Sequence, residues 1–525
     1  MRGQPISCVP VGFGLSKKTK PLPRKPGDEK CRQWFAVCLI IVLGFYLRIV
    51  YLTYGLPYVP NGDEAINFNV LNGMVQNGDF NPGFFRYPSL LFNLNLPGQY
   101  ALDHLVGPIS NVDVQAIGTG FLDHEAALIL ARATGVFLGV GTVCLVIWAV
   151  CRVTGSPWGG VLGGLLLAIS PLSIRYASYF TPDVTATFFV TSSVVASMMI
   201  VRNPSLFWYV LAGGFGGLAA STKYNAGAVV IAIVIASFVV SGKSRRNLSG
   251  ICVSASIATI VFLGVSPFLI LDFSSAWSGF IFELNHYRTG HPGAEGDSFI
   301  QNLSWMHQQT GWTFLVIIPA LFSGTHQKVV LPVFGFLLCY FALLSNQNVR
   351  FERNILPLLP SYFLLVAIGG SCAVHKISKL FGRESYLRVY VPLVGLAVLF
   401  LFRSPLSMTL DQFRFYDRDP NQAARLWLEE YLPDSGQIVI EAYTPYLALL
   451  NRDLVSHPFL LEQDVETTSS SDFAVITHRG SGRFLSGNYE VQHQRFIDLK
   501  AMACDFGTFP PEAETASITV LHFEC

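Results

Sequence analysis

The sequence predicts a polytopic α-helical membrane protein of about eleven spans that ends in a small extracytoplasmic α/β module. Hydrophobic residues make up 51% of the 525 residues and charged residues only 13%, and the mean hydropathy is +0.45. Apolar runs of about 16–27 residues recur along the chain, which is the length that an α-helix needs to cross a bilayer. The net charge of +1 gives no reason to expect a nucleic-acid partner.

Residues 1–33 carry eight Lys or Arg but no apolar core, so they do not form a cleavable signal peptide. We expect a basic cytoplasmic segment there, followed by a first span that acts as an uncleaved signal-anchor. The ten cysteines show neither CxxC nor Cys/His metal spacing, and we interpret most of them as small buried side chains. The expected spans are 34–54, 124–150, 158–174, 181–201, 206–221, 224–241, 250–271, 311–323, 329–345, 354–371 and 387–403.

The segment 90–106 decides the orientation of everything after it. It is apolar but broken by asparagines and by Pro97-Gly98. If it does not cross, the basic connections fall on the same side as the basic N-terminus, as the positive-inside rule requires. We therefore expect 90–106 to be a juxtamembrane helix, and the long loop 55–123 to face the extracytoplasmic side. The cytoplasmic basic residues are then Arg152, Arg202, Lys243, Arg245, Arg246, Lys328, Lys376, Lys379 and Arg383.

After Arg403 the composition changes to that of a soluble module, 404–525, on the outer side. Asp419-Pro420 is typical of a helix start, with Asp as the N-cap and Pro in the first turn. Strand-like runs follow at 437–442, 472–477 and 517–523, which indicates an α/β arrangement. Cys504 and Cys525 both lie in this module, and whether they pair remains open.

The first outer loop carries the most unusual set of residues. Asp63 and Glu64 are adjacent acids, and Arg86 is the only Lys or Arg between residues 55 and 123. An acid at the membrane surface suits a general base, although two acids here also suit the start of a helix. Arg86, followed by Tyr87, suits the bidentate binding of a phosphate, although it also suits an interfacial arginine that snorkels.

Further candidates lie in the later outer loops. Asp183 follows Thr181-Pro182 at the start of a span, so it is either part of a helix cap or a second carboxylate of the site. Lys223 and Tyr224 form a polar break between two apolar runs. Five cations of the outer loops are too many to be scattered interface anchors, and a lipid phosphate would lie at their level. They are Arg86, Lys223, Arg288, Arg350 and Arg353. The remaining outer candidates for substrate or phosphate binding are His286, Arg288, His291, Arg350 and Arg353. The two histidines lack the spacing of a one-helix metal site and leave a divalent metal as an open alternative.

These motifs resemble the GT-C membrane glycosyltransferases of the protein O-mannosyltransferase and aminoarabinose-transferase type. The resemblance covers about residues 34–400 and is weak for the tail. It rests on Gly62-Asp63-Glu64, on Phe85-Arg86-Tyr87-Pro88, on Tyr179-Phe180-Thr181-Pro182-Asp183, on Thr222-Lys223 and on Arg353-Asn354-Ile355-Leu356-Pro357. Two positions depart from the family pattern. The segment around Arg86 lacks an acid, which puts a metal site in doubt, and Asn354 replaces an aromatic residue.

The resemblance implies a catalytic membrane domain at 34–403 that transfers a sugar from a polyprenyl-phosphate donor, with inversion and without a nucleotide sugar. It implies that Asp63 is the catalytic base, and that Arg86, Lys223 and Arg353 hold the phosphate. The acceptor would be a lipid, a glycan or a protein, and the protein would lie in the plasma (inner) membrane. The alternatives are a transporter or flippase of a lipid-linked solute, and a glycan polymerase or ligase of the same fold. A transporter would place its polar residues near mid-membrane.

Overall fold

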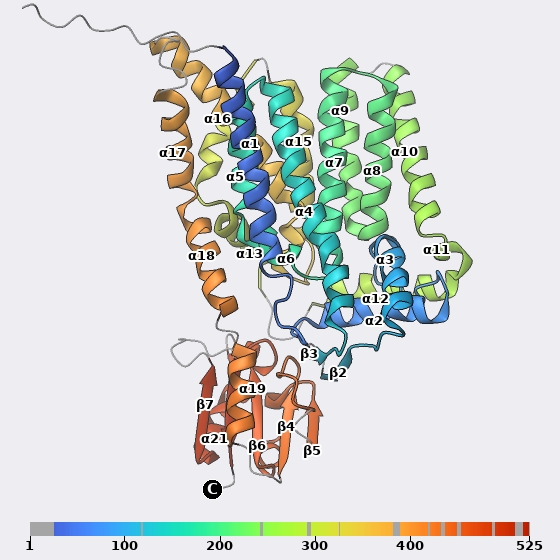
Figure 1. Cartoon of the computed structure of the whole chain (residues 1–525), viewed down its shortest axis with the longest axis vertical. Coiled ribbons are helices and arrows are strands. Elements are labelled where there is room, and N and C mark those ends of the chain that lie inside the picture. The colour runs from blue at the N-terminus through green and yellow to red at the C-terminus, as the bar shows by residue number, and fades with distance from the viewer. Residues whose placement is uncertain are drawn as a thin grey trace, which may run out of the picture.

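The structure is a computed structural model, and it describes residues 26–116, 119–241, 245–290, 296–324, 326–381, 389–417, 420–431, 436–448, 453–485, 489–509 and 518–523. A bundle of long helices forms most of it, and a smaller region with a β-sheet lies beyond one end of the bundle (Figure 1). The expected fold class, a helical membrane protein with a small C-terminal α/β part, is confirmed.

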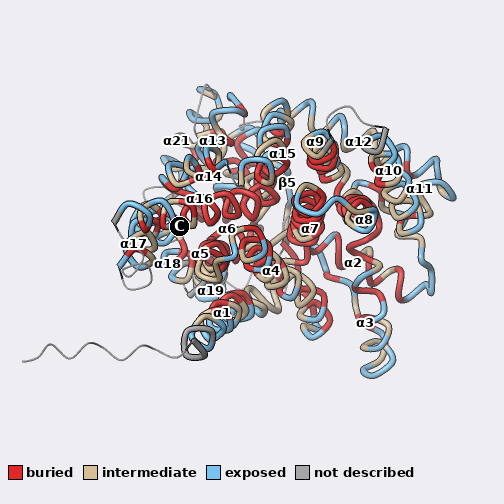
Figure 2. Tube along the Cα trace, turned by 90° about the horizontal axis from the view of Figure 1, so that it is seen from above, coloured by how far each residue is buried: buried red, intermediate tan, exposed pale blue. Residues whose placement is uncertain are grey.

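Six of the described helices are long and apolar enough to cross a bilayer. The inner members α7 and α16 are mostly buried, whereas α1 and α10 at the margin have few buried residues, as Figure 2 shows. Because each helix is apolar on all sides, the exposed faces of the outer helices suit contact with lipid tails. The six are α1 (Pro26–Ile49), α4 (Glu125–Thr154), α7 (Pro182–Arg202), α10 (Arg245–Val265), α15 (Gln327–Ser345) and α16 (Leu358–Phe381).

Two expected spans are bent pairs of helices. The run 158–174 forms α5 (Pro157–Ala168) and α6 (Pro171–Ala177), which meet at 62°. The last run, 387–403, corresponds to α17 (Val391–Leu401), which meets α18 (Arg403–Asp417) at 63°. Two shorter apolar helical stretches stand beside α7, namely α8 (Leu206–Thr222) and the continuous pair η1 (Tyr224–Val229) and α9 (Val230–Ser241).

The expectation of a continuous span at 311–323 is wrong. These residues form a 3-10 turn, η2 (Thr313–Val316), and the short helix α14 (Ile318–Leu321). Two residues account for the break. Gly311 has φ of 57°, which ends the preceding helix α13 (Ser298–Thr310), and Pro319 lacks the amide hydrogen that a longer helix would need.

The first outer loop folds at the lower end of the bundle in Figure 1, where α2 lies across the ends of the long helices. It contains β1 (Tyr58–Val59), α2 (Gly62–Asn77), α3 (Leu90–Val106), β2 (Asp113–Ala116) and β3 (Thr119–Phe121). The strands pair in the antiparallel order β1-β3-β2. Asn61 caps α2 by accepting a hydrogen bond from the Asp63 amide at 3.1 Å. The helix α3 is not among the described helices that are long and apolar enough to span.

Other outer segments lie at the same end of the bundle. They are α11 (Phe268–Leu271), α12 (Phe273–Thr289) and the 3-10 turn η3 (Glu352–Ile355). A side-chain hydrogen bond from Asn81 to Asp272 Oδ2 at 3.1 Å joins the first loop to the start of α12. The Tyr224 hydroxyl donates to the Phe85 carbonyl at 3.0 Å, which joins that loop to η1.

The C-terminal region is a three-layer α/β/α unit. Its sheet has the order β5-β4-β6-β8-β7, and β4, β5 and β6 are parallel while β7 and β8 pair antiparallel. Alternate residues of β4 face opposite layers: Ile438 and Ile440 pack with α19, whereas Val439 packs with α21. The elements are α19 (Pro420–Tyr431), β4 (Gln437–Glu441), β5 (Asp453–His457), η7 (Leu460–Glu462), α20 (Val465–Ser469), β6 (Phe473–Thr477), η8 (Ser481–Leu485), α21 (Glu490–Met502), β7 (Asp505–Phe509) and β8 (Ile518–His522).

The three expected strands correspond to β4, β6 and β8, while the pairing with β5 and β7 emerges only in the structure. Helix α18 belongs to the bundle side, because the Thr409 hydroxyl donates to the Ile169 carbonyl at 2.8 Å. Cys504 is disulfide-bonded, and Cys525 lies outside the described residues.

A buried ion pair ties the first loop to the bundle. Both side chains, Glu64 on α2 and Arg132 on α4, have no exposed surface. Arg132 Nε and Nη2 donate to the two Glu64 carboxylate oxygens at 2.7 and 2.8 Å. Arg132 Nη1 also donates to the carbonyls of Leu52 and Tyr54, and the Phe180 amide donates to Glu64 at 2.7 Å. Four chain segments therefore meet at one pair of charges.

We expect Arg132→Met to destabilise the fold by about 3–5 kcal/mol, because it leaves the Glu64 carboxylate buried without its partner. The measurement is equilibrium unfolding of the purified protein in detergent. Arg414→Met is the matched control, because Arg414 and Asp411 form an exposed pair whose loss costs at most about 1 kcal/mol. Equal stability of the two variants would contradict a structural role for the buried pair.

Candidate active site

Four candidates from separate loops meet at the lower end of the bundle. Arg353 of η3 lies between two carboxylates: its Nη1 is 2.6 Å from Asp63 Oδ2, and its Nε is 4.0 Å from Asp183 Oδ2. Lys223 Nζ is 2.9 Å from Asp183 Oδ1. These ion pairs join the starts of α2 and α7, the end of α8 and η3. We call Asp63, Asp183, Lys223 and Arg353 the charge cluster.

Local sequence explains why the two acids occupy these positions. Asp63 and Asp183 both lie in the first turn of a helix, where the aligned backbone dipoles favour a negative charge. Pro182 precedes Asp183 at the first helical position, where its missing amide hydrogen costs nothing. Because α2 lies across the bundle and α7 runs along it, their N-termini can approach each other (Figure 1).

The two carboxylates differ in their exposure. The Asp63 side chain is 35% exposed, whereas that of Asp183 is 3% exposed. Burial lowers the pKa of Arg353, but Asp63 and Asp183 outweigh that effect and raise its pKa well above the usual value, so it stays charged. Asp63 is therefore the acid of the cluster that a ligand outside the bundle can reach, while Asp183 holds the two cations in place.

Asn354 belongs to the same network. It is buried, and its Oδ1 accepts a hydrogen bond from Lys223 Nζ at 3.0 Å. Sequence reasoning noted this position only as a departure from the family pattern. An amide oxygen satisfies a lysine donor without adding a further negative charge, which an aromatic side chain could not do.

Arg86 and Tyr87 lie on the approach to the cluster. The Arg86 side chain is exposed, and its guanidinium lies 4.0 Å from the centroid of Phe282 on α12 and 5.8 Å from that of Phe84. Burial raises the pKa of Tyr87, and the nearby Asp63 raises it further. The Tyr87 phenol therefore remains protonated and available as a donor.

Helix α12 contributes residues that sequence reasoning partly missed. Burial raises the pKa of Glu283 against the opposing effect of Lys223, Arg86 and Arg353. Burial lowers the pKa of His286, and Arg86 and Arg353 lower it further, which favours the neutral imidazole. The helical spacing of Glu283 and His286 places them on one face, and this was the available signal for Glu283.

The other expected substrate residues are less closely joined to the cluster. Arg288 is exposed, and Arg350 is half-buried against the backbone of Gly296. Tyr224 contributes its hydroxyl to the Phe85 carbonyl, as described above. His291 lies outside the described residues.

A divalent metal remained open in the sequence. In the part of the chain that the structure describes, no group of three or more His, Cys, Asp or Glu side chains could hold a metal ion. The two carboxylates of the cluster instead have Arg353 between them. This set does not fit a metal ion.

Comparison with known proteins finds a family model that matches part of the chain and solved structures that are similar to it. Residues 123–271 match the family model described as dolichyl-phosphate-mannose-protein mannosyltransferase. Among solved structures, ArnT from Cupriavidus metallidurans in the apo state is similar over 94% of this chain and 98% of its own, with a TM-score of 0.56 and 14% identity. The chain has a GT-C fold. No curated protein sequence matches it.

Two further structures share the GT-C fold. ArnT from the same organism bound to undecaprenyl phosphate covers 93% of this chain and 98% of its own, with a TM-score of 0.55 and 14% identity. The archaeal oligosaccharyltransferase AglB from Archaeoglobus fulgidus, in complex with an inhibitory peptide and a dolichol-phosphate, covers 94% of this chain and 74% of its own. Its TM-score is 0.57 at 11% identity. The chain shares the fold of these structures over more than nine tenths of its length.

We expect Asn354→Leu to destabilise the fold by about 1–3 kcal/mol, because it leaves a donor of the buried Lys223 without its acceptor. Thermal unfolding in detergent measures the change. Asn346→Leu is the control, because Asn346 is exposed and bonds only within its own helix turn. A shift no larger than that of the control would show that Asn354 does not support Lys223.

Proposed function

We propose that the protein transfers a sugar from a polyprenyl-phosphate donor to an acceptor at the extracytoplasmic face, with Asp63 as the general base. The observation that carries this proposal is the convergence of Asp63, Asp183, Lys223 and Arg353, in which Asp63 is the exposed acid. The GT-C fold supports it, because two structures with that fold hold undecaprenyl phosphate or dolichol-phosphate.

The chemistry is a single displacement. The acceptor nucleophile attacks the anomeric carbon of the donor, and its proton passes to the Asp63 carboxylate. The bond between the anomeric carbon and the phosphate oxygen breaks, and polyprenyl phosphate leaves with the electron pair. Because the nucleophile enters opposite the leaving group, the anomeric configuration inverts.

The cations around Asp63 supply the phosphate site. Arg86 is exposed, and its guanidinium stacks on Phe282, which leaves the planar fork available to a phosphate. Arg353 carries a charge that a leaving phosphate can share with Asp63, and Lys223 lies behind it against Asp183. In this proposal Arg86 and Arg353 stabilise the charge that develops on the phosphate, while Lys223 positions Asp183 and Arg350 lies further out.

We assign Glu64 a structural role instead of the catalytic one considered from sequence. Its carboxylate has no exposed surface and accepts from Arg132 and from the Phe180 amide. A base must reach the proton that it removes. Asp63 meets that requirement, whereas Glu64 points into the protein.

The position of the charge cluster favours an enzyme over a transporter. The cluster residues lie at helix termini and in turns, whereas a transporter is expected to bind its substrate near mid-membrane. A glycan polymerase or ligase would use the same donor chemistry and differs from this proposal only in its acceptor.

We expect Asp63→Asn to lower sugar transfer by about 10²–10⁴-fold, because the amide cannot accept the proton. In a deletion strain that carries this variant, the lipid-linked sugar donor should accumulate as it does in the deletion strain itself. Mass spectrometry of extracted lipids measures this accumulation and also names the donor.

Asp79→Asn is the matched control, because Asp79 is an exposed acid of the same loop that bonds only to its own turn. It should restore the wild-type lipid profile. A wild-type profile in cells with folded Asp63→Asn protein would remove Asp63 from the role of base.

We expect Phe80→Cys to react with a membrane-impermeant thiol reagent added to intact cells, because Phe80 is 63% exposed in the first outer loop. Lys328→Cys, at the start of α15 and hence at the opposite end of the bundle, should react only after permeabilisation. Both variants are made in a background without other cysteines. The reverse pattern would overturn the proposed orientation.

A further inference from the structure

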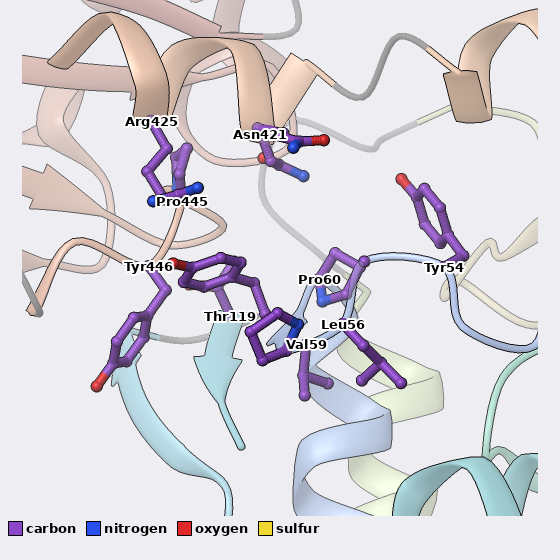
Figure 3. A pocket seen from close by; sticks show the side chains of 13 residues that line it. Tyr54, Leu56, Val59, Pro60, Thr119, Asn421, Arg425, Pro445 and Tyr446 are labelled. Carbon is purple, nitrogen blue, oxygen red and sulfur yellow. The ribbon is translucent and has the colours of Figure 1, made fainter. Parts of the chain in front are cut away.

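A cavity of about 380 Å³ lies between the first outer loop and the C-terminal unit (Figure 3). The loop contributes residues 54–60 and Thr119, and the C-terminal unit contributes the start of α19 together with Pro445 and Tyr446. A cavity of this size falls within the range of small-molecule sites. None of the proposed catalytic residues lines it.

Hydrogen bonds between the two parts shape the walls of this cavity. The Thr119 hydroxyl donates to the Thr444 carbonyl at 2.5 Å, and Gln115 Nε2 donates to the Pro445 carbonyl at 3.2 Å. The Tyr446 hydroxyl bonds to the Asp113 carboxylate. The cavity is therefore built from directed contacts between two folded parts.

One wall is aromatic. Tyr446 stacks on Phe121 with 5.5 Å between ring centroids, and Tyr58 lies 6.3 Å from Tyr446. The guanidinium of Arg425 lies 4.2 Å from the centroid of Tyr58 and holds that ring in place. Figure 3 shows Tyr446 and Arg425 on one side of the cavity and Tyr54 on the opposite side. Tyrosine rings offer a flat apolar face with a polar edge, which suits the C–H face of a pyranose ring.

Two of the polar side chains of the cavity are amides. Asn421 and Gln422 lie on the first turn of α19 and line the cavity. A side-chain amide both donates and accepts hydrogen bonds, as the neighbouring hydroxyls of a sugar do. Aromatic faces with amides at their edge thus match a carbohydrate better than a hydrocarbon.

The charges of the cavity are already neutralised. Arg425 pairs with Glu429 on the same helix, and the Tyr446 hydroxyl is engaged by Asp113. Burial raises the pKa of Tyr446, and its hydrogen bond with Asp113 raises it further, so the phenol carries no charge. A phosphate or carboxylate would find no uncompensated cation among the described residues that line the cavity, which favours a neutral ligand.

The cavity is joined to the charge cluster through the chain and through a series of tyrosines. Pro60 lines it, and Asp63 follows three residues later. Tyr54, also in the lining, is 6.5 Å from Tyr179, which is 6.0 Å from Tyr176. Tyr176 in turn is close enough to Arg353 and Asp183 for their charges to affect its pKa.

We propose that this cavity binds a neutral carbohydrate portion of the acceptor, about one or two pyranose rings in size. The inference rests on the proposed function, because it names the acceptor class of the same site. The cavity would hold the acceptor glycan by stacking on Tyr58 and Tyr446 and by hydrogen bonds to the α19 amides. The nucleophilic hydroxyl would then lie toward Asp63.

Saturation-transfer NMR on the full-length protein in detergent tests this proposal. The probes are maltose, cellobiose, mannobiose and N-acetyllactosamine, each added alone. We expect at least one of them to receive saturation from the wild-type protein. Gln422→Trp, which places an indole in the cavity without removing a packed residue, and Tyr58→Ala should each weaken binding by about tenfold.

Two controls separate this proposal from the catalytic one. Gln494→Trp changes an exposed glutamine on α21 of the same C-terminal unit and should leave sugar binding unchanged. Asp63→Asn should also keep sugar binding while it loses transfer. A failure of the catalytic prediction therefore leaves the binding result intact, and the reverse also holds.

Three outcomes would overturn the proposal. The first is that none of the four sugars binds the wild-type protein. The second is that binding survives Gln422→Trp unchanged. The third is that an unglycosylated acceptor peptide, and no sugar, binds in a manner that Gln422→Trp abolishes.

Discussion

The buried pair of Glu64 and Arg132 is the contact on which the geometry of the charge cluster depends. Two charges without any exposed surface are stable only when each is matched by its partner and by hydrogen bonds. Here those bonds come from the backbone before α2 and from the Phe180 amide, which precedes α7. The same pair therefore fixes the starts of both helices that carry the acids of the cluster. The exposure of Asp63 follows from this arrangement, because adjacent residues of a helix face different directions and Glu64 faces the protein interior.

The charge cluster repeats this principle at lower burial. Asp183 is enclosed and holds two cations, Lys223 and Arg353, while Asp63 receives the outer side of Arg353. In the proposed reaction, Arg353 can exchange its partner, because the phosphate of an approaching donor can replace Asp63 beside its guanidinium. Such an exchange would free Asp63 when the donor is in place. The donor would thus bind before Asp63 becomes available to the acceptor.

Hydropathy and the distribution of basic residues were sufficient to predict a helical membrane protein and to predict that α3 is not one of its spans. The side of the membrane on which the site lies stays a prediction. The same patterns predicted Lys223 as a site candidate because it interrupts two apolar runs, where a charge is costly, and Asp183 because it stands at the start of a span. They could not separate Asp63 from Glu64, since adjacent residues of a helix face different directions and only the position of Arg132 decides between them. The break at 311–323 was missed because hydropathy does not report backbone angles.

The hydrogen bonds between β2, β3 and the turn before Tyr446 have a consequence for exchange of parts between related proteins. The C-terminal unit is held by side chains of the first loop, such as Asp113, Gln115 and Thr119. A C-terminal unit that is transplanted into a related protein without its own first loop would lack these partners. The mismatch would lie in the same loop that carries Asp63. In chimera design, the loop strands and the C-terminal unit should therefore be transferred together, although more than 300 residues separate them.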